Sequence, residues 1–202
     1  MNSRKFTFLL LLCLASLANA QNFKSGIIAG ISTSQVSGDN LGGFHKAGIV
    51  CGSFVTTKIG DSSAVEMEIL YVQKGSQQAQ DLAKGKAFYQ IKLNYAEVPL
   101  LYKFRIRKFT YEVGASIGFL IHSKVSDMYG EFPPKNPESR PFKKTETSIF
   151  AGINYKIYNH FSVNWRFTNS VLPVRNHVAG SYKLNLGQYN TAMYFALRYD
   201  FK

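Results

Sequence analysis

Cysteine and acidic residues are scarce in this chain of 202 residues. It has two cysteines, and its 12 acidic residues face 24 lysines and arginines, a formal net charge of +12. Cys13 lies in an N-terminal apolar run, so Cys51 is the only cysteine beyond it. A single cysteine excludes both an internal disulfide and a thiolate-rich metal site. A surplus of basic residues usually predicts binding to nucleic acid. In an exported protein it predicts contact with acidic saccharides or lipid head groups instead.

A long apolar segment is also missing beyond residue 20, which excludes a transmembrane helix there. The first twenty residues have the form of a signal peptide: two basic residues, an apolar run from Phe6 to Leu17, and the small-residue site Ala18-Asn19-Ala20. That run is too short for a comfortable membrane anchor. We expect cleavage between Ala20 and Gln21, which leaves residues 21–202 as one domain.

Eight stretches of alternating apolar and polar residues fill the mature chain. They are residues 23–34, 46–57, 64–74, 88–106, 109–123, 146–158, 161–170 and 189–201. The connections between them are alternately long and short, which is typical of a barrel with tight periplasmic turns and longer outer loops. We therefore predict an all-β fold: an eight-stranded antiparallel up-and-down transmembrane β-barrel with both termini on the periplasmic side.

Residue type predicts which face of each strand meets lipid, because hydrocarbon does not tolerate charge. The apolar stripes should face outward. In three stretches they are Phe109, Tyr111, Val113, Ala115, Ile117, Phe119 and Ile121; Ile149, Ala151, Ile153, Tyr155 and Ile157; and Phe161, Val163, Trp165 and Phe167. His122 falls on the opposite, inward face. Tyr155 and Trp165 are the best candidates for an aromatic belt at the head groups.

The stretch 88–106 is irregular. Ile91, Leu93 and Tyr95 hold one phase of the alternation, whereas Val98 and the apolar residues after it hold the other. A bulge within residues 96–99 would restore the register, and Pro99 suits such a place because it cannot donate to the sheet.

Charged residues recur on the predicted inward faces. They are Glu66, Glu68, Glu97, Glu112, Lys103, Arg105, Arg166 and Arg198. Such a set could line a selective pore. An eight-stranded barrel, however, is only wide enough for side chains to fill, so we expect a structural network of ion pairs that plugs the lumen.

Basic residues also gather in the predicted outer loops. They are Lys84, Lys86, Lys135, Arg140, Lys143, Lys144, Arg175 and Lys183. Cations at an outer rim can bridge the phosphates and carboxylates of lipopolysaccharide. We expect outer-membrane lipids and lipopolysaccharide as partners, with envelope proteins or a secretion apparatus as further candidates, and no nucleic acid.

Several short motifs resemble one family. They are Gly26 to Ile31, the stretch from Lys46 to Gly52, Glu68 to Tyr71 followed by Gln73-Lys74-Gly75, and Leu93-Asn94-Tyr95 with Pro99 and Lys103. In this order and spacing they are similar to the PorT-like outer-membrane β-barrel family of Bacteroidota-type bacteria, over about residues 23–201. The resemblance implies an eight-stranded outer-membrane barrel from a Gram-negative source. It implies little about activity, although the founding member is linked to protein secretion.

The sequence predicts an integral protein of the cell outer membrane with a structural or interaction role, whose outer loops form the recognition surface. No catalysis, metal or cofactor is expected, because no nucleophile motif or acidic cluster is present. Three alternatives stay open: an accessory role in secretion or transport, a soluble lipocalin-like carrier of a small apolar ligand, and a lipid-modifying or proteolytic enzyme. For that enzyme, His45 and His177 at the outer rim would be tested first.

Overall fold

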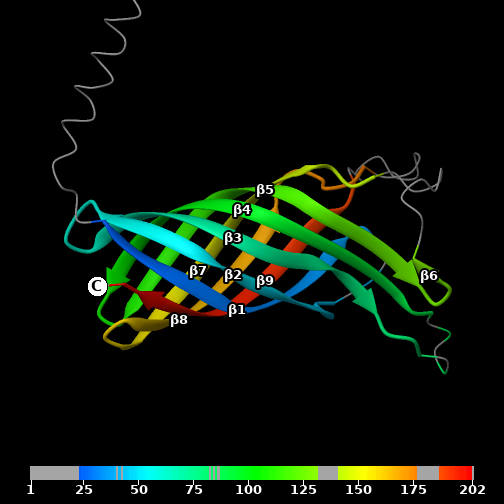
Figure 1. The fold of residues 1–202 in the computed structure, drawn as a ribbon, viewed down its shortest axis with the longest axis horizontal. Helices are drawn as coiled ribbons and strands as arrows, with labels where there is room; N and C mark the ends of the chain where they lie inside the picture. Colours follow the sequence, from blue (N-terminus) through cyan, green and yellow to red (C-terminus); the bar gives the residue numbers. More distant parts are fainter. Residues whose placement is uncertain are drawn as a thin grey trace, which may run out of the picture.

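The computed structural model describes residues 23–39, 41, 43–81, 83, 85, 87–131, 141–176 and 187–201 (Figure 1). Their strands are β1 (Lys24–Ser37), β2 (Lys46–Lys58), β3 (Ser63–Gln78), β4 (Tyr89–Ile106), β5 (Phe109–Asp127), β6 (Gly130–Glu131), β7 (Thr145–Tyr158), β8 (Phe161–Ser170) and β9 (Tyr189–Asp200). Among these residues no helix has the length and apolar character needed to cross a membrane.

Eight of the strands close into an antiparallel barrel. Each long strand pairs with its neighbour in the chain, β4 pairs with β5, and β1 pairs with β9 from Gly26↔Asp200 to Ser37↔Tyr189. Around the body of the barrel, closure leaves no unpaired sheet edge, which is the condition for a sheet to cross hydrocarbon. The predicted eight-stranded barrel is confirmed, and β6 is an added two-residue hairpin on the end of β5.

The two ends of the barrel differ. At one end, which we call the short-turn end, the strands are joined by residues 59–62, 107–108 and 159–160, and both ends of the barrel sequence lie there. The opposite end, called here the long-loop end, carries the longer connections (Figure 1). This division is the one that the sequence predicted.

The outer wall is apolar and the interior is charged. The outward-facing side chains predicted for residues 109–119, 149–157 and 161–167 are exposed or half-buried on the wall. Glu68, Glu112 and Arg166, on the other hand, are at most 1% exposed inside. A soluble lipocalin-like carrier needs the reverse arrangement, with an apolar cavity and a polar wall.

The predicted bulge within residues 96–99 is wrong. All odd-numbered residues of β4 from Ile91 to Lys103 are buried, so the strand keeps one phase throughout. The apparent change of phase in the sequence arises because the interior is apolar toward the long-loop end, where Val36, Ile91, Leu93 and Tyr95 form a cluster.

The register shift lies at Asn94 and Tyr95, and the extra residue belongs to β5. Tyr95 pairs with Leu120 and Asn94 pairs with His122, so Ile121 has no partner on β4. Such a bulge reverses the alternation of the residues that follow it. Leu120, before the bulge, still packs inward, whereas His122, after it, is exposed, contrary to the inward position predicted for that histidine.

Candidate functional site

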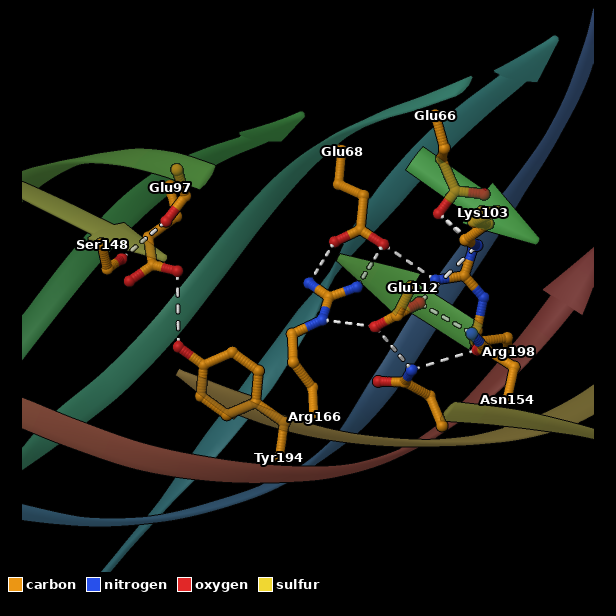
Figure 2. A network of polar contacts seen from close by, with 12 residues as sticks. Glu66, Glu68, Glu97, Lys103, Glu112, Ser148, Asn154, Arg166, Tyr194 and Arg198 are labelled. Carbon is orange, nitrogen blue, oxygen red and sulfur yellow. Dashed lines mark hydrogen bonds and ion pairs between the residues drawn. The ribbon is translucent and has the colours of Figure 1, made fainter. Parts of the chain in front are cut away.

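A buried network of ion pairs occupies the middle of the barrel (Figure 2). Arg166 on β8 is its centre: its two terminal nitrogens donate to Glu68 Oε2 at 2.6 Å and Oε1 at 2.9 Å, and its Nε donates to Glu112 Oε1 at 2.7 Å. This paired donation to one carboxylate is the strongest geometry available to arginine. Strands β3, β5 and β8 are therefore linked through the lumen as well as through the sheet.

Arg198 on β9 extends the network toward the short-turn end. It donates to Glu68 Oε1 at 2.8 Å and to Glu66 Oε1 at 2.7 Å, and Lys103 Nζ lies 2.6 Å from the same Glu66 oxygen. Three carboxylates thus face three cations, so this group is formally neutral. A neutral, fully paired arrangement limits the cost of burying six charges.

Neutral groups add further hydrogen bonds to the carboxylates of the network. Asn154 donates to Glu112 Oε2 at 2.7 Å, Asn164 donates to Glu112 Oε1 at 3.0 Å, and Thr56 donates to Glu66. Aromatic rings cover the guanidinium planes: Arg198 lies 3.9 Å from the centroid of the Phe54 ring, a cation–π arrangement.

A second buried cluster lies nearer the long-loop end. Lys74 Nζ is 2.5 Å from Glu97 Oε1 and 2.9 Å from Glu146 Oε1. Asn190 donates to Glu146 Oε2 at 2.9 Å, and the Tyr194 hydroxyl lies 3.4 Å from Glu97 Oε2. This cluster holds one more carboxylate than cations.

The structure thus divides the eight residues predicted for the lumen. Six of them form the central network, Glu97 belongs to the second cluster, and Arg105 is exposed at the short-turn end. Sequence reasoning missed Lys74 and Glu146 because each lies at the end of a predicted stretch. Their alternation phase was the available signal: Lys74 lies six residues after Glu68, and Glu146 two before the inward Ser148.

Comparison with known proteins identifies the fold's family. The family model of the outer membrane protein beta-barrel domain matches residues 6–201. The chain belongs to this family. Among curated proteins, the sequence search finds no match.

Solved outer-membrane barrels have similar folds. Ail, the attachment invasion locus protein of Yersinia pestis, is 14% identical, with 88% of this chain and 98% of that chain covered and a TM-score of 0.51. The Neisserial surface protein A is 10% identical, with 89% and 97% covered and a TM-score of 0.49. At 14% identity, the likeness to Ail shows the fold alone.

In an outer-membrane barrel the short turns face the periplasm and the longer loops face outward. The periplasmic end of the wall carries pairs of aromatic side chains with tilted rings: the ring centroids of Phe109 and Tyr155 are 5.1 Å apart, and those of Phe161 and Tyr199 are 4.9 Å apart. Tyr155 therefore lies in an aromatic girdle, as expected at a membrane surface. Val163 is the partner of Tyr155 on β8, and Trp165 lies two residues beyond Val163, farther from the periplasmic end than Tyr155.

Three of the basic residues predicted for the outer loops are described. Lys143 and Lys144 are exposed directly before β7, and the guanidinium of Arg175 lies 4.8 Å from the centroid of the Phe142 ring. Lys84, Lys86, Lys135, Arg140 and Lys183 lie outside the described residues, as do Ala20, Gln21 and His177.

The described part of the outer rim holds no arrangement typical of catalysis. Within it, no group of three histidines, cysteines or acids is close enough to hold a metal ion. His45 and His122 are both exposed, and neither ring bonds to a serine or a carboxylate of the described chain. A hydrolytic site needs a base within hydrogen-bond reach of its nucleophile.

Proposed function

We propose that this protein is a non-catalytic interaction protein of the outer membrane, anchored by a plugged barrel, whose outer end contacts lipopolysaccharide. The observation that carries the proposal is a wall of three strands that rises above the rest of the barrel on one side. The last pair between β5 and β7 is Phe119↔Thr145, yet β5 continues for eight residues to Asp127. Eight strand residues span about 26 Å along the strand.

The raised wall is a regular sheet. Beyond that level, β5 pairs with β4 as far as Tyr89↔Asp127, and β4 pairs with β3 as far as Gln78↔Tyr89. Figure 1 shows these strands reaching farthest at the long-loop end. A sheet positions side chains more rigidly than a loop does, which suits a binding surface.

The outward face of the raised wall changes from apolar to basic. Phe119 and Ile121 are 51% and 60% exposed, as expected for residues that contact lipid. Three residues farther along, Lys124 lies directly opposite Lys92 on β4. Lys124 is also 2.6 Å from Glu131, whereas Lys92 forms no ion pair within the described residues.

Lysines just above an apolar band lie where the phosphates of lipopolysaccharide meet the membrane surface. Lys143 adds a third cation, which is exposed next to the start of β7. Charge-assisted contacts from ammonium groups to phosphate would hold the lipid against this side of the barrel.

The test measures the binding of purified lipopolysaccharide to the folded protein in a non-ionic detergent, with native mass spectrometry to detect the complex. We expect retention by the wild type and a loss of about tenfold in affinity for the Lys92→Glu/Lys124→Glu variant. Lys58→Glu/Lys108→Glu, at the opposite end, is the matched control, because it makes the same change in net charge, and it should bind as the wild type does. Equal binding by all three proteins would overturn the proposal.

We also propose the finer assignments made from the sequence: membership of the PorT-like branch, a Gram-negative source and export through a signal peptide. The motif residues Glu68 and Lys103, both of which take part in the central network, support the first. Cleavage predicts a mature protein that begins at Gln21, which the intact mass of protein from outer membranes would test. A mass that includes residues 1–20 would contradict it.

A further inference from the structure

A cavity of about 580 Å³ lies inside the barrel at the periplasmic end. The central network forms its floor, since Glu66, Lys103 and Arg198 all line it. Its walls are the last residues of the strands and the short turns between them. Cavities of this size hold small organic molecules in many proteins.

The lining is strongly basic. Eight of its side chains are cationic: Lys24, Lys58, Lys103, Arg105, Arg107, Lys108, Lys156 and Arg198. Three are acidic: Asp61, Glu66 and Asp200. Glu66 is already engaged by Lys103 and Arg198 in the floor, so it does not neutralise the walls.

Strand register places four of these cations around the opening. Lys24 precedes the inward-facing Gly26, Lys58 follows Thr56, Arg105 follows Lys103 and Lys156 follows Asn154, each by two residues. Because side chains two apart on a strand share a face, all four belong to the inward face of their strands. They come from β1, β2, β4 and β7, and hence from different sides of the barrel.

These four cations and the two in the turn, Arg107 and Lys108, form no ion pair with any carboxylate of the described residues. Against these six cations the walls hold two carboxylates, Asp61 and Asp200, so the concave site keeps a surplus of positive charge, and its low-dielectric walls strengthen the field inside it. The central network beneath is neutral without them. The arrangement therefore favours an external anion with several charges.

We propose that this cavity binds a small anion bearing two or more phosphate groups, taken up from the periplasmic side. The guanidinium groups of Arg105 and Arg107 can each contact two phosphate oxygens, and the lysines supply further charge. Thr110 and Ser162, which also line the cavity, add hydroxyl donors. The proposal is independent of lipopolysaccharide binding at the outer end.

The phosphates could belong to a soluble organic phosphate or to the head group of a phospholipid in the inner leaflet. Inositol hexakisphosphate is a suitable soluble probe, and cardiolipin, which has two phosphates, is a suitable lipid. The two sources are distinguished by competition: cardiolipin in nanodiscs that hold the barrel displaces the soluble probe only if it enters the same cavity.

Isothermal titration calorimetry with the folded protein in a non-ionic detergent tests the proposal. We expect saturable binding of one inositol hexakisphosphate, weakening as salt is raised from about 0.05 to 0.5 M because screening shortens the range of the charges. The Arg105→Gln/Lys156→Gln variant should bind at least about tenfold more weakly. Lys143→Gln/Lys144→Gln, which removes the same number of charges at the outer end, should bind as the wild type does.

Retained heat-modifiability on unboiled gels shows that each variant is folded. Absence of saturable binding at low salt would overturn the proposal, as would equal weakening by the two variants. Displacement by cardiolipin would assign the site to a lipid head group, whereas binding that cardiolipin leaves unchanged would assign it to a soluble phosphate.

Discussion

At the residue scale, the charged interior depends on complete pairing. A buried ion pair adds little net stability over apolar residues of the same volume, but removing one partner leaves the other buried without compensation. Arg166 is the extreme case, because it is 1% exposed and bonds to both Glu68 and Glu112. Its loss would leave two carboxylates without their main partner.

We expect Arg166→Met to lower the free energy of unfolding by about 3–5 kcal/mol. Urea unfolding in detergent, followed by the fluorescence of Trp165, the single tryptophan, measures this. Adding Glu112→Gln should recover part of the loss, because it removes one uncompensated charge. Lys143→Met, at an exposed site, should change stability by less than about 0.5 kcal/mol. An unchanged unfolding midpoint for Arg166→Met would refute the structural role of the network.

The carboxyl of Asp39, in the loop after β1, should make the stability of the fold depend on pH. Burial raises the pKa of its carboxyl above the ordinary value of 3.8, although the backbone N–H of Leu41 donates to it. Because the folded-state pKa is the higher one, the contribution of Asp39 to stability is present below pH 3.8 and is lost as pH rises through the folded-state pKa.

Asp39→Asn should therefore remove part of the fall in thermal stability above pH 4. The difference from the wild type should stay under about 1 kcal/mol, because the carboxyl is only half-buried. Thermal unfolding between about pH 3.5 and pH 7, compared between the two proteins, measures it. Parallel curves would show that the carboxyl titrates alike in both states.

At the scale of the element, strand positions could be predicted from sequence, because lipid on one side and a narrow interior on the other impose strict alternation. The limits of β7 and β8, for example, fall within one residue of the prediction. The interior of β4 could not be predicted. Ile91, Leu93 and Tyr95 look like lipid-facing residues, but they pack inside, and alternation alone does not separate two apolar faces.

The bulge in β5 gives a prediction about register. Ile121 is the extra residue, and β7 no longer pairs with β5 at that level. Deleting Ile121 should restore plain alternation without shifting any other strand. Deleting Ile117, which pairs with both Val98 and Thr147, should instead reverse the faces of the β5 residues on one side of it, a slip that would carry the buried Glu112 toward the lipid face.

We therefore expect the Ile121 deletion to keep the heat-modifiable band on unboiled gels and the Ile117 deletion to lose it. Both remove the same residue type from the same strand, so each is a control for the other. Equal behaviour of the two would mean that the described register does not govern assembly.

At the scale of the whole molecule, the barrel is a cylinder plugged by a buried ion-pair network, and the two binding sites proposed above lie at its two ends. Alternation and the basic composition predict such an object in outline. They do not predict how the charges are shared between a neutral centre and a basic periplasmic cavity. That division depends on which strands face one another across the lumen, as Glu68 and Arg166 do from β3 and β8.

Cys51 offers a test of how the whole barrel sits in the membrane. It is free and exposed in the middle of β2, on the apolar wall beside Ala29 and Tyr71. In a lipid vesicle this thiol should face hydrocarbon. We expect a lipid-soluble maleimide to label it and a charged, membrane-impermeant maleimide to leave it unlabelled, because a charged reagent does not enter hydrocarbon.

Ser62→Cys in a Cys51→Ser background places the single thiol in a short turn at the aqueous end, and the charged reagent should label it in open membrane fragments. Detergent denaturation should expose Cys51 to both reagents. Rapid labelling of native Cys51 by the charged maleimide would mean that water, not lipid, covers the wall. The inward and outward assignments of the barrel would then describe a soluble protein.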